Sequence, residues 1–211
     1  MIIHPIVHME RMKEEHKASV SQLLFQGFSS KLGTGLKDAQ LLLLLEWFLM
    51  LDEQRGNGQR IVALQESSVI GSLSLQFQSW SGEKRPSGTV TDLLPLWKGI
   101  QRAGWGKALG CAVRLACLSH RPARGEMYIA DVSVHQHFRG SGVGQSLLEW
   151  ALREAMTRPE IRYTSLHVSG SNVRAKRLYE RMGFRTLEVQ RSLFMTWLLG
   201  EQEWNYMIYE G

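Results

Sequence analysis

The chain has 211 residues, a net charge of +5 and 44% hydrophobic residues. This length suits one domain, or one domain with an elaboration, and the hydrophobic content is ample for a core. Charged residues make up only 21% of the chain, which excludes a highly charged disordered protein. Cys111 and Cys117 have no His or Cys partner near them in the sequence, which argues against a zinc site or a disulfide framework and favours a reduced, intracellular protein.

Neither the N-terminal apolar run nor the most apolar segment of the chain indicates a membrane or secreted protein. The N-terminal apolar run is short, is interrupted by His4 and Pro5, and has no basic region before it, so it does not resemble a signal peptide. The most apolar segment, residues 41–51, has eleven residues and contains Glu46, which is too short to span a bilayer. We therefore expect a soluble cytoplasmic protein that does not bind membranes.

The first half of the chain predicts a strand, two helices and two further strands. The strand is expected within residues 2–9, the helices at 11–33 and 36–52, and the two strands within 60–80 around a polar turn. Residues 81–125 predict a helical elaboration that Pro95 and several glycines interrupt. We expect it to form a lid or wall over a pocket; an amphipathic surface helix is the alternative.

The second half alternates strands and helices. Strands are expected at residues 126–134, 163–171, 184–194 and 203–210, and helices at 143–158 and 172–182. Gly183 is expected to stop the second of these helices. The predicted order is β-α-α-β-β-α-β-α-β-α-β-β, in one domain that spans residues 1–211 without internal repeats or a long linker.

Positive charge is concentrated in one part of the chain. Residues 139–185 contain nine Lys or Arg against four Asp or Glu. This excess indicates either a solvated basic helix face or a site for an anion. Nucleic acid is not expected as a partner, because the sequence has no basic run interleaved with aromatic residues and no helix-turn-helix or zinc-finger spacing.

Three alternating glycines, Gly140, Gly142 and Gly144, follow Arg139 between a predicted strand and a predicted helix. The first turn of a helix has unpaired N–H groups, and glycine allows a phosphate to approach them closely. The Lys-Ser/Thr pair of a P-loop is missing, and the G-x-G-x-G spacing differs from that of a dinucleotide-binding fold. A glycine-rich turn that binds nothing is the alternative.

Two stretches of sequence together resemble a known family. ADVSVHQHFRGSGVGQSLLEWAL (residues 130–152) resembles the acetyl-CoA-binding signature of the GNAT superfamily of N-acetyltransferases, with Arg139, Gly142 and Gly144 at its key positions. LHVSGSNVRAKRLYERMGF (residues 166–184) is similar to the second hallmark of that family. The resemblance covers residues 126–188. It implies an α/β (α+β) fold: a mixed, mostly antiparallel central sheet of about seven strands flanked by helices, with 81–125 as an addition.

The resemblance implies acetyl-CoA as cosubstrate and assigns its contacts. In this family the motif strand splays from its neighbour and pairs with the pantetheine arm, which would place Val132, Ser133 and Val134 there. The pyrophosphate would lie on the loop and helix start, at Arg139, Gly140, Ser141, Gly142, Val143 and Gly144. Asn172 would cap a helix and contact the pantetheine region. Arg174, Lys176 and Arg177 could reach the 3′-phosphate, or form a solvated helix face. No metal is expected.

The resemblance also implies the catalytic groups. Tyr179 resembles the family's general acid, which protonates the leaving thiolate; a tyrosine that only packs is the alternative. The acceptor amine also needs a base, because a lysine-type ammonium is mostly protonated at pH 7. Glu126 is the first candidate, and Asp131 the second, on the opposite face of the strand if alternation holds. His135 and His137 are expected on the loop surface.

The predicted function is transfer of an acetyl group from acetyl-CoA to a primary amine by direct attack on the thioester, with a strand N–H such as that of Val132 stabilising the developing charge. A non-catalytic acyl-CoA sensor or scaffold is the main alternative, and a nucleotide-binding protein is another. The acceptor is left open among small amines, amino acids, peptide N-termini and protein lysines. Its pocket is expected near residues 28–36 and 191–204, with Trp80, Trp97, Trp105, Trp197 and Trp204 as apolar surroundings. Homodimers are common in the resembling family, but the sequence leaves the oligomeric state open.

Overall fold

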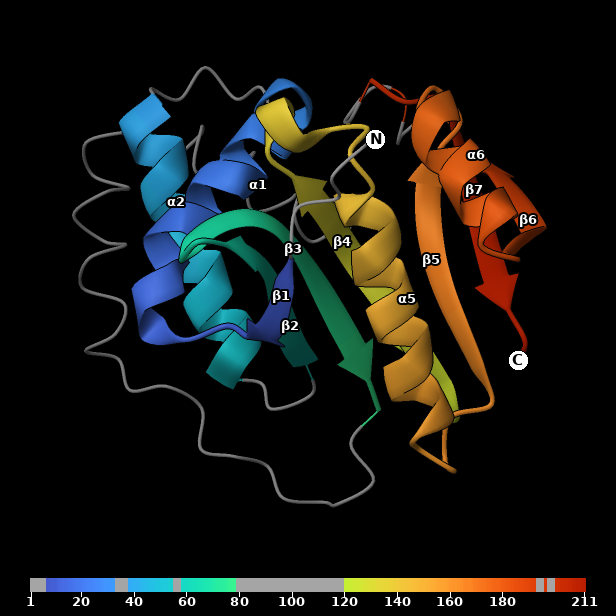
Figure 1. Cartoon of the computed structure of the whole chain (residues 1–211). Coiled ribbons are helices and arrows are strands. Elements are labelled where there is room, and N and C mark those ends of the chain that lie inside the picture. The colour runs from blue at the N-terminus through green and yellow to red at the C-terminus, as the bar shows by residue number, and fades with distance from the viewer. Residues whose placement is uncertain (1–6, 33–37, 55–57, 79–119, 193–195, 197–199) are drawn as a thin grey trace.

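A computed structural model describes residues 7–32, 38–54, 58–78, 120–192, 196 and 200–211. Seven strands form one sheet in the order β1-β2-β3-β4-β5-β7-β6 (Figure 1). Every neighbouring pair is antiparallel except β4 and β5, which are parallel. The strands are β1 His8–Arg11, β2 Gly58–Gln65, β3 Ser68–Phe77, β4 Glu126–Val134, β5 Tyr163–Ser169, β6 Arg185–Arg191 and β7 Glu203–Tyr209. The mixed, mostly antiparallel sheet is as predicted.

Helices cover both faces of this sheet because neighbouring residues of its strands point to opposite sides. On β2, Val62 packs with Val20 and Leu45, whereas Ile61 packs with Leu147. α1 and α2 therefore lie on one face, and α5 and α6 lie on the other, in front of the strands in Figure 1. The helices are α1 Lys17–Leu32, α2 Asp38–Gln54, α5 Val143–Met156 and α6 Val173–Arg181.

Most of the predicted elements are confirmed within one to three residues, and β4 has the predicted bounds. The first strand differs: the sequence predicts it within residues 2–9, and β1 covers His8–Arg11, with 1–6 outside the described residues. Most of the predicted helical elaboration, residues 79–119, also lies outside them. No helix in the described part of the chain combines the length and the run of apolar residues that a bilayer span requires.

A β-bulge interrupts β4 at Ala130. Ile129 pairs with Leu75 of β3, and Asp131 pairs with the next residue, Ser74, so Ala130 has no partner in the ladder. A bulge of one residue moves the following side chains to the other face of a strand. Asp131 consequently lies on the same face as Glu126, and the prediction that these two carboxylates lie on opposite faces is wrong.

β4 and β5 diverge beyond this bulge. Their parallel pairing ends at Ile129 and Leu166, whereas β4 stays paired with β3 up to Val134 and β5 stays paired with β7 up to Ser169. The two ribbons separate toward the upper edge of Figure 1. This is the splay implied by the family resemblance, and it leaves the edge of β4 from Ala130 to Val134 without a pairing strand on the β5 side.

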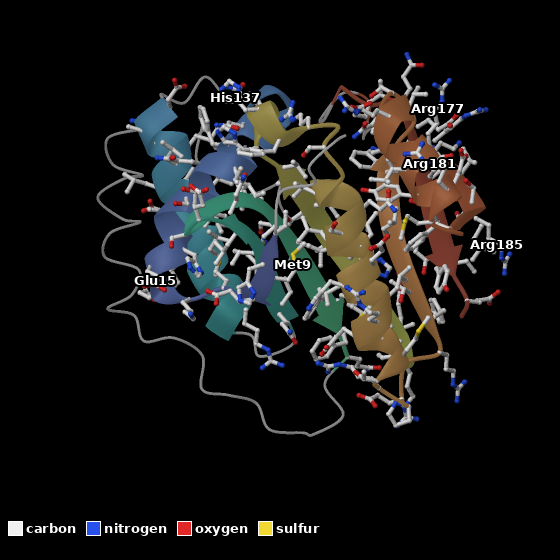
Figure 2. All side chains as sticks on the ribbon, viewed as in Figure 1. Met9, Glu15, His137, Arg177, Arg181 and Arg185 are labelled. Atoms are coloured by element: carbon white, nitrogen blue, oxygen red, sulfur yellow. The ribbon has the colours of Figure 1, made fainter. Side chains whose placement is uncertain are left out.

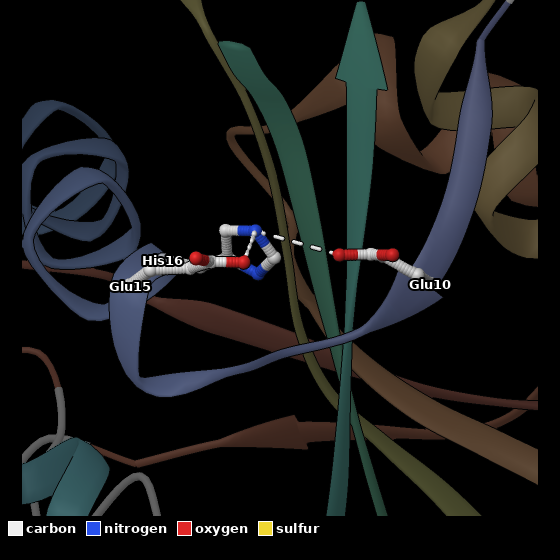
Figure 3. Close-up of side chains that lie close together, drawn as sticks. All are labelled: Glu10, Glu15 and His16. Carbon is white, nitrogen blue, oxygen red and sulfur yellow. Dashed lines mark ion pairs between the residues drawn. The ribbon is translucent and has the colours of Figure 1, made fainter. Parts of the chain in front are cut away.

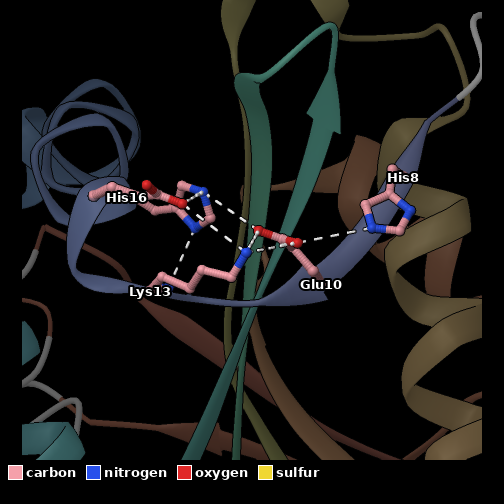
Figure 4. A network of polar contacts seen from close by, with 5 residues as sticks. His8, Glu10, Lys13 and His16 are labelled. Carbon is pink, nitrogen blue, oxygen red and sulfur yellow. Dashed lines mark hydrogen bonds and ion pairs between the residues drawn. The ribbon is translucent and has the colours of Figure 1, made fainter.

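The corner between β1 and α1 is braced by an ion-pair network (Figure 4). The carboxylates of Glu10 and Glu15 lie 3.4 and 3.7 Å from Nε2 of His16, as Figure 3 shows. The ammonium of Lys13 lies 3.0 Å from Glu10 and 3.9 Å from Glu15. Although the oxygen and nitrogen atoms of this cluster gather within 4.8 Å, Lys13 already supplies a balancing positive charge. The network therefore fixes the turn that leads from β1 into α1.

Candidate active site

The glycine-rich loop forms an uncapped helix start at the carboxyl end of β4. Gly140 and Gly142 have φ values of 90° and 91°, a conformation that residues with a Cβ adopt only with strain. Gly142 is the N-cap of α5, and no side chain in the described part of the chain caps this helix. The N–H groups of the first turn of α5 have no acceptor within the helix. Together with the helix dipole, they make a site for an anionic group.

Two arginines lie at this loop. Arg139 donates from Nε to the carbonyl of Val134 at 3.2 Å, which braces the turn from strand to loop. Arg174 reaches the loop from α6: its Nη2 lies 2.8 Å from the position that a Cβ on Gly140 would occupy. The absence of a side chain at Gly140 thus allows a guanidinium from another element to lie against the loop backbone.

The other predicted basic residues of α6 lie elsewhere. Lys176 donates from Nζ to Oδ1 of Asn205 at 2.9 Å, so it is engaged with β7. Arg177 is exposed and lies on the outer surface with Arg181 and Arg185 (Figure 2). Of the three candidates for the 3′-phosphate, Arg174 is the one that the structure places at the glycine loop.

α6 begins with Asn172 and carries Tyr179 into the core. The Asn172 side chain accepts a hydrogen bond from the N–H of Ala175 at 3.2 Å, so the predicted N-cap is confirmed. Tyr179 is 9% exposed, and its ring lies 6.0 Å from that of Phe184. Burial, reinforced by the negative charge of Asp131, raises the pKa of Tyr179 to about 12. Its phenol therefore keeps its proton at neutral pH, as an acid must, and no hydrogen bond joins its hydroxyl to another described residue.

Glu126 lies at the start of β4 and is 2% exposed. Its carboxylate accepts hydrogen bonds from the N–H of Ala123 at 2.6 Å, from the hydroxyl of Tyr206 at 2.9 Å and from Ser165, and it lies 2.9 Å from Nε2 of His120. Burial alone would raise the pKa of Glu126, but these partners lower it to about 2. The structure argues against the predicted role of general base, because a carboxylate so fully hydrogen-bonded has little tendency to take up a proton.

Acid should weaken the fold through this carboxylate. The folded pKa of Glu126 is about 2 against an ordinary value of 4.5. A lowered pKa stabilises the folded state above the unfolded value, and this stabilisation is lost as pH falls from about 5 to about 2. Glu126→Gln should therefore reduce the loss of unfolding free energy that the protein suffers across that pH range, by on the order of 3 kcal/mol.

Urea unfolding between pH 7 and pH 2.5 measures this effect. Glu160→Gln, at an exposed carboxylate, is the matched control and should keep the wild-type dependence on pH. If Glu126→Gln loses as much unfolding free energy at low pH as the wild type does, this carboxylate does not contribute to the acid sensitivity of the fold.

Asp131, the second candidate base, is held by Arg60. Two hydrogen bonds of 2.8 and 2.7 Å join the guanidinium to the carboxylate, and Arg60 also donates to Ser72 at 3.0 Å. The side chains of Arg60 and Asp131 are only 3% and 10% exposed. A buried bidentate pair occupies both oxygens of the carboxylate. Asp131 is therefore also poorly suited to accept a proton from a substrate.

The structure shows a candidate proton acceptor that the sequence reasoning missed. His167 is the first residue of β5 beyond the pairing with β4, and its Nδ1 lies 3.1 Å from the hydroxyl of Tyr128. Burial, together with the nearby His120, lowers the pKa of His167 to about 4, so the imidazole is neutral at pH 7. Among the described residues, none makes a hydrogen bond to its Nε2.

Three rings surround this histidine on the face that carries α1 and α2. The ring of His167 lies 4.9 Å from Tyr206, 5.7 Å from Tyr128 and 5.3 Å from His120. The ring of His120 lies 4.3 Å from that of Tyr128. We call His120, Tyr128, His167 and Tyr206 the ring cluster. It lies beside the splay, with the buried Glu126 at its base.

The remaining predicted site residues of this region lie on β4 and on the loop that follows it. Val132 and Val134 lie on the splayed part of β4, and Ser133 faces α1, where its Oγ is 3.5 Å from the position that a Cβ on Gly27 would occupy. His137 is exposed, and its ring lies 5.3 Å from that of His135. The acceptor wall predicted from residues 28–36 and from Trp80, Trp97, Trp105 and Trp197 lies outside the described residues or side chains.

Comparison with known proteins identifies the family of this arrangement. The model of the acetyltransferase (GNAT) family matches residues 22–184. The chain belongs to the GNAT acetyltransferase family. Its members transfer acetyl groups, and the splayed β4–β5 pair and glycine loop described above fall within the matched residues.

Individual GNAT relatives are distant. An uncharacterized N-acetyltransferase, YycN of Bacillus subtilis, is 37% identical over 67 residues, which cover 32% of this chain and 42% of that protein. Among solved structures, an IAA acetyltransferase from Bacillus cereus is 18% identical with a TM-score of 0.54, covering 97% of this chain and 99% of that one. The ribosomal-protein-S18-alanine N-acetyltransferase from Escherichia coli is 12% identical with a TM-score of 0.55, covering 97% and 94%. These likenesses of structure support the GNAT fold alone.

Proposed function

We propose that this protein is an N-acetyltransferase that uses acetyl-CoA and a primary amine. The observation that carries the proposal is the position of the splay. The splay begins at a neutral histidine, His167, and lies beside the glycine-lined start of α5, while the neighbouring helix α6 carries the buried Tyr179.

The residues present fit the cosubstrate. The amides from Arg139 to Gly144 would hold the pyrophosphate, and Arg174 would add a positive charge at the same point. The splayed edge of β4, at Val132, Ser133 and Val134, offers backbone groups to the pantetheine arm, and Asn172 lies at the start of the facing helix. A Cβ at Gly144 would lie 3.5 Å from Leu178 and 3.7 Å from Val134, so the start of α5 lies close to both α6 and β4.

Two side chains would transfer protons in the reaction, one as acceptor and one as donor. Acetyl-CoA supplies an acetyl thioester, which a neutral amine attacks to give an amide and free thiol. His167 would take the proton of the amine at Nε2, in the tautomer in which its Nδ1–H donates to the oxygen of Tyr128. Tyr179 would give its proton to the leaving sulfur, and an N–H of the splayed strand, such as that of Val132, would stabilise the charge on the carbonyl oxygen. Glu126 would act as a positioning residue that fixes His120 and Tyr206.

Arg174→Gln should weaken binding of acetyl-CoA by about tenfold or more, because it removes a charged donor from the phosphate site. Arg177→Gln is the matched control, since Arg177 is an exposed arginine three residues further along the same helix. Isothermal titration at two salt concentrations measures both dissociation constants. Equal affinities in the two variants would show that Arg174 does not contact the cosubstrate.

Acceptor-dependent release of free thiol tests the proposal as a whole. The purified protein is mixed with acetyl-CoA and a panel of primary amines, and the acetylated product is identified by mass. We expect thiol release that requires both partners. Binding of acetyl-CoA without transfer to any amine would contradict the proposal and favour an acyl-CoA sensor.

A further inference from the structure

The groups around His167 restrict which amines this site can use. Among the described residues, the charged and titratable groups near it are Glu126 and Tyr128 on β4, Tyr206 on β7, Glu188 on β6, and His120 before β4, with Asp131 further along β4. Transfer to an amine that arrives as an ammonium ion requires a group here that can take its proton.

The carboxylates among these groups do not serve as strong proton acceptors. Glu126 is occupied by its surrounding donors, and Asp131 is held in the bidentate pair with Arg60. Glu188 lies on the exposed edge strand, accepts a hydrogen bond from Gln190 at 3.3 Å, and pairs with Tyr206 across the β6–β7 ladder. Two strand spacings, about 10 Å, therefore separate it from β5.

The phenols do not serve as bases either. Burial raises the pKa of both Tyr128 and Tyr206, so both keep their protons at neutral pH. Among the described residues beside the splay, imidazole nitrogen is left as the proton acceptor, and it is a weak base when half-buried among other rings. Such a base can remove a proton from a weakly basic amine far more readily than from a strongly basic one.

We infer that the acceptor is a weakly basic α-amine, such as the N-terminus of a peptide or an amino-acid derivative, rather than a lysine side chain or a polyamine. This inference rests on the proposed function. Its physical basis is the fraction of the amine that is neutral at the working pH. An α-amine with a pKa near 8 has a neutral fraction at pH 7 roughly 200-fold larger than that of a lysine with a pKa near 10.4. Because the described residues of the site include no strong base, transfer has to rely on that neutral fraction of the amine.

Two peptides of one sequence with a single lysine provide the test. In the first, the N-terminus is free and the lysine is acetylated; in the second, the N-terminus is acetylated and the lysine is free. We expect kcat/KM at pH 7 to be at least 100-fold higher for the first peptide. The ratio should fall roughly 35-fold between pH 8 and pH 10, as the lysine becomes neutral and the α-amine gains little more. Alaninamide and spermidine form a parallel pair of small acceptors, with the same order expected.

Each outcome supports or overturns the inference. Equal or faster acetylation of the lysine peptide, or of spermidine, overturns it and leaves the transferase function intact. A preference for the α-amine that stays constant from pH 8 to pH 10 also overturns it, because selection would then rest on shape rather than on amine basicity. If no acceptor of either pair is acetylated by protein that binds acetyl-CoA, the proposed transfer function itself fails.

Discussion

Tyr179→Phe is expected to lower kcat by about 10²-fold while changing the affinity for acetyl-CoA by less than about twofold. The ring of Tyr179 packs in the core beside Phe184, and phenylalanine keeps that packing. What is lost is the proton of a buried phenol whose pKa of about 12 keeps it protonated at every pH at which the enzyme would work. A departing thiolate has a conjugate acid with a pKa near 8.5, so it gains from a donor of this kind.

Steady-state thiol release gives kcat, and isothermal titration gives the affinity. Tyr209→Phe is the matched control, because Tyr209 also packs against Phe184, at 5.6 Å, and lies on the last strand. It should leave kcat unchanged. If both variants retain full turnover, Tyr179 only packs and the leaving thiolate is protonated by another group or by water.

His167→Gln is expected to lower kcat/KM by about 10²-fold, because it removes the neutral imidazole that we propose as the acceptor of the amine proton. The pKa of about 4 also predicts the pH profile. In the wild type the imidazole is unprotonated above pH 5, so its own titration should not limit the rate at neutral pH, where the supply of neutral amine does. Below pH 5 the rate should fall more steeply in the wild type than in the variant.

A second substitution separates catalysis from structure at this site. Tyr128→Phe removes the hydrogen-bond partner of Nδ1 and leaves the ring in place, so we expect a loss of about tenfold through poorer positioning of His167. His137→Gln, on the exposed loop, is the control and should be neutral. Full activity of His167→Gln would contradict the assignment and point to a water chain that ends at another group.

The local structure of the proposed cofactor half of the site could be predicted from the sequence because it depends on short motifs. The glycine loop, Asn172 and Tyr179 each lie in a short motif, and a β-α turn positions its own residues. Arg174 is one of three candidate basic residues, and only the packing of α6 against the loop distinguishes it from Lys176 and Arg177.

The acceptor half could not be predicted in the same way because it depends on register between distant strands. Tyr206 meets His167 only because β7 inserts between β5 and β6. Asp131 changes face because of one bulged residue, Ala130, which strict alternation does not foresee. One signal was available: Ser165, His167 and Ser169 are polar residues at every second position of β5, a pattern that marks one polar face of a strand.

Glu126 illustrates how hydrogen-bond partners change the chemistry of a carboxylate. A carboxylate at the start of the motif strand has the chemistry of a base when seen in the sequence. In the fold it is surrounded by donors, and its pKa falls to about 2 instead of rising toward 7. A general base needs a pKa closer to the working pH or a free lone pair aimed at substrate, and the imidazole of His167 offers the lone pair.

Isothermal titration of the purified protein with acetyl-CoA, with dephospho-CoA and ATP as comparators, tests the central claim most directly. We expect that acetyl-CoA binds tightly at the glycine loop and the splay, that dephospho-CoA binds more weakly, and that ATP does not bind. No binding of any of the three to the folded protein would contradict this claim, because the uncapped start of α5 would then be a structural turn and not a cradle for the pyrophosphate of CoA.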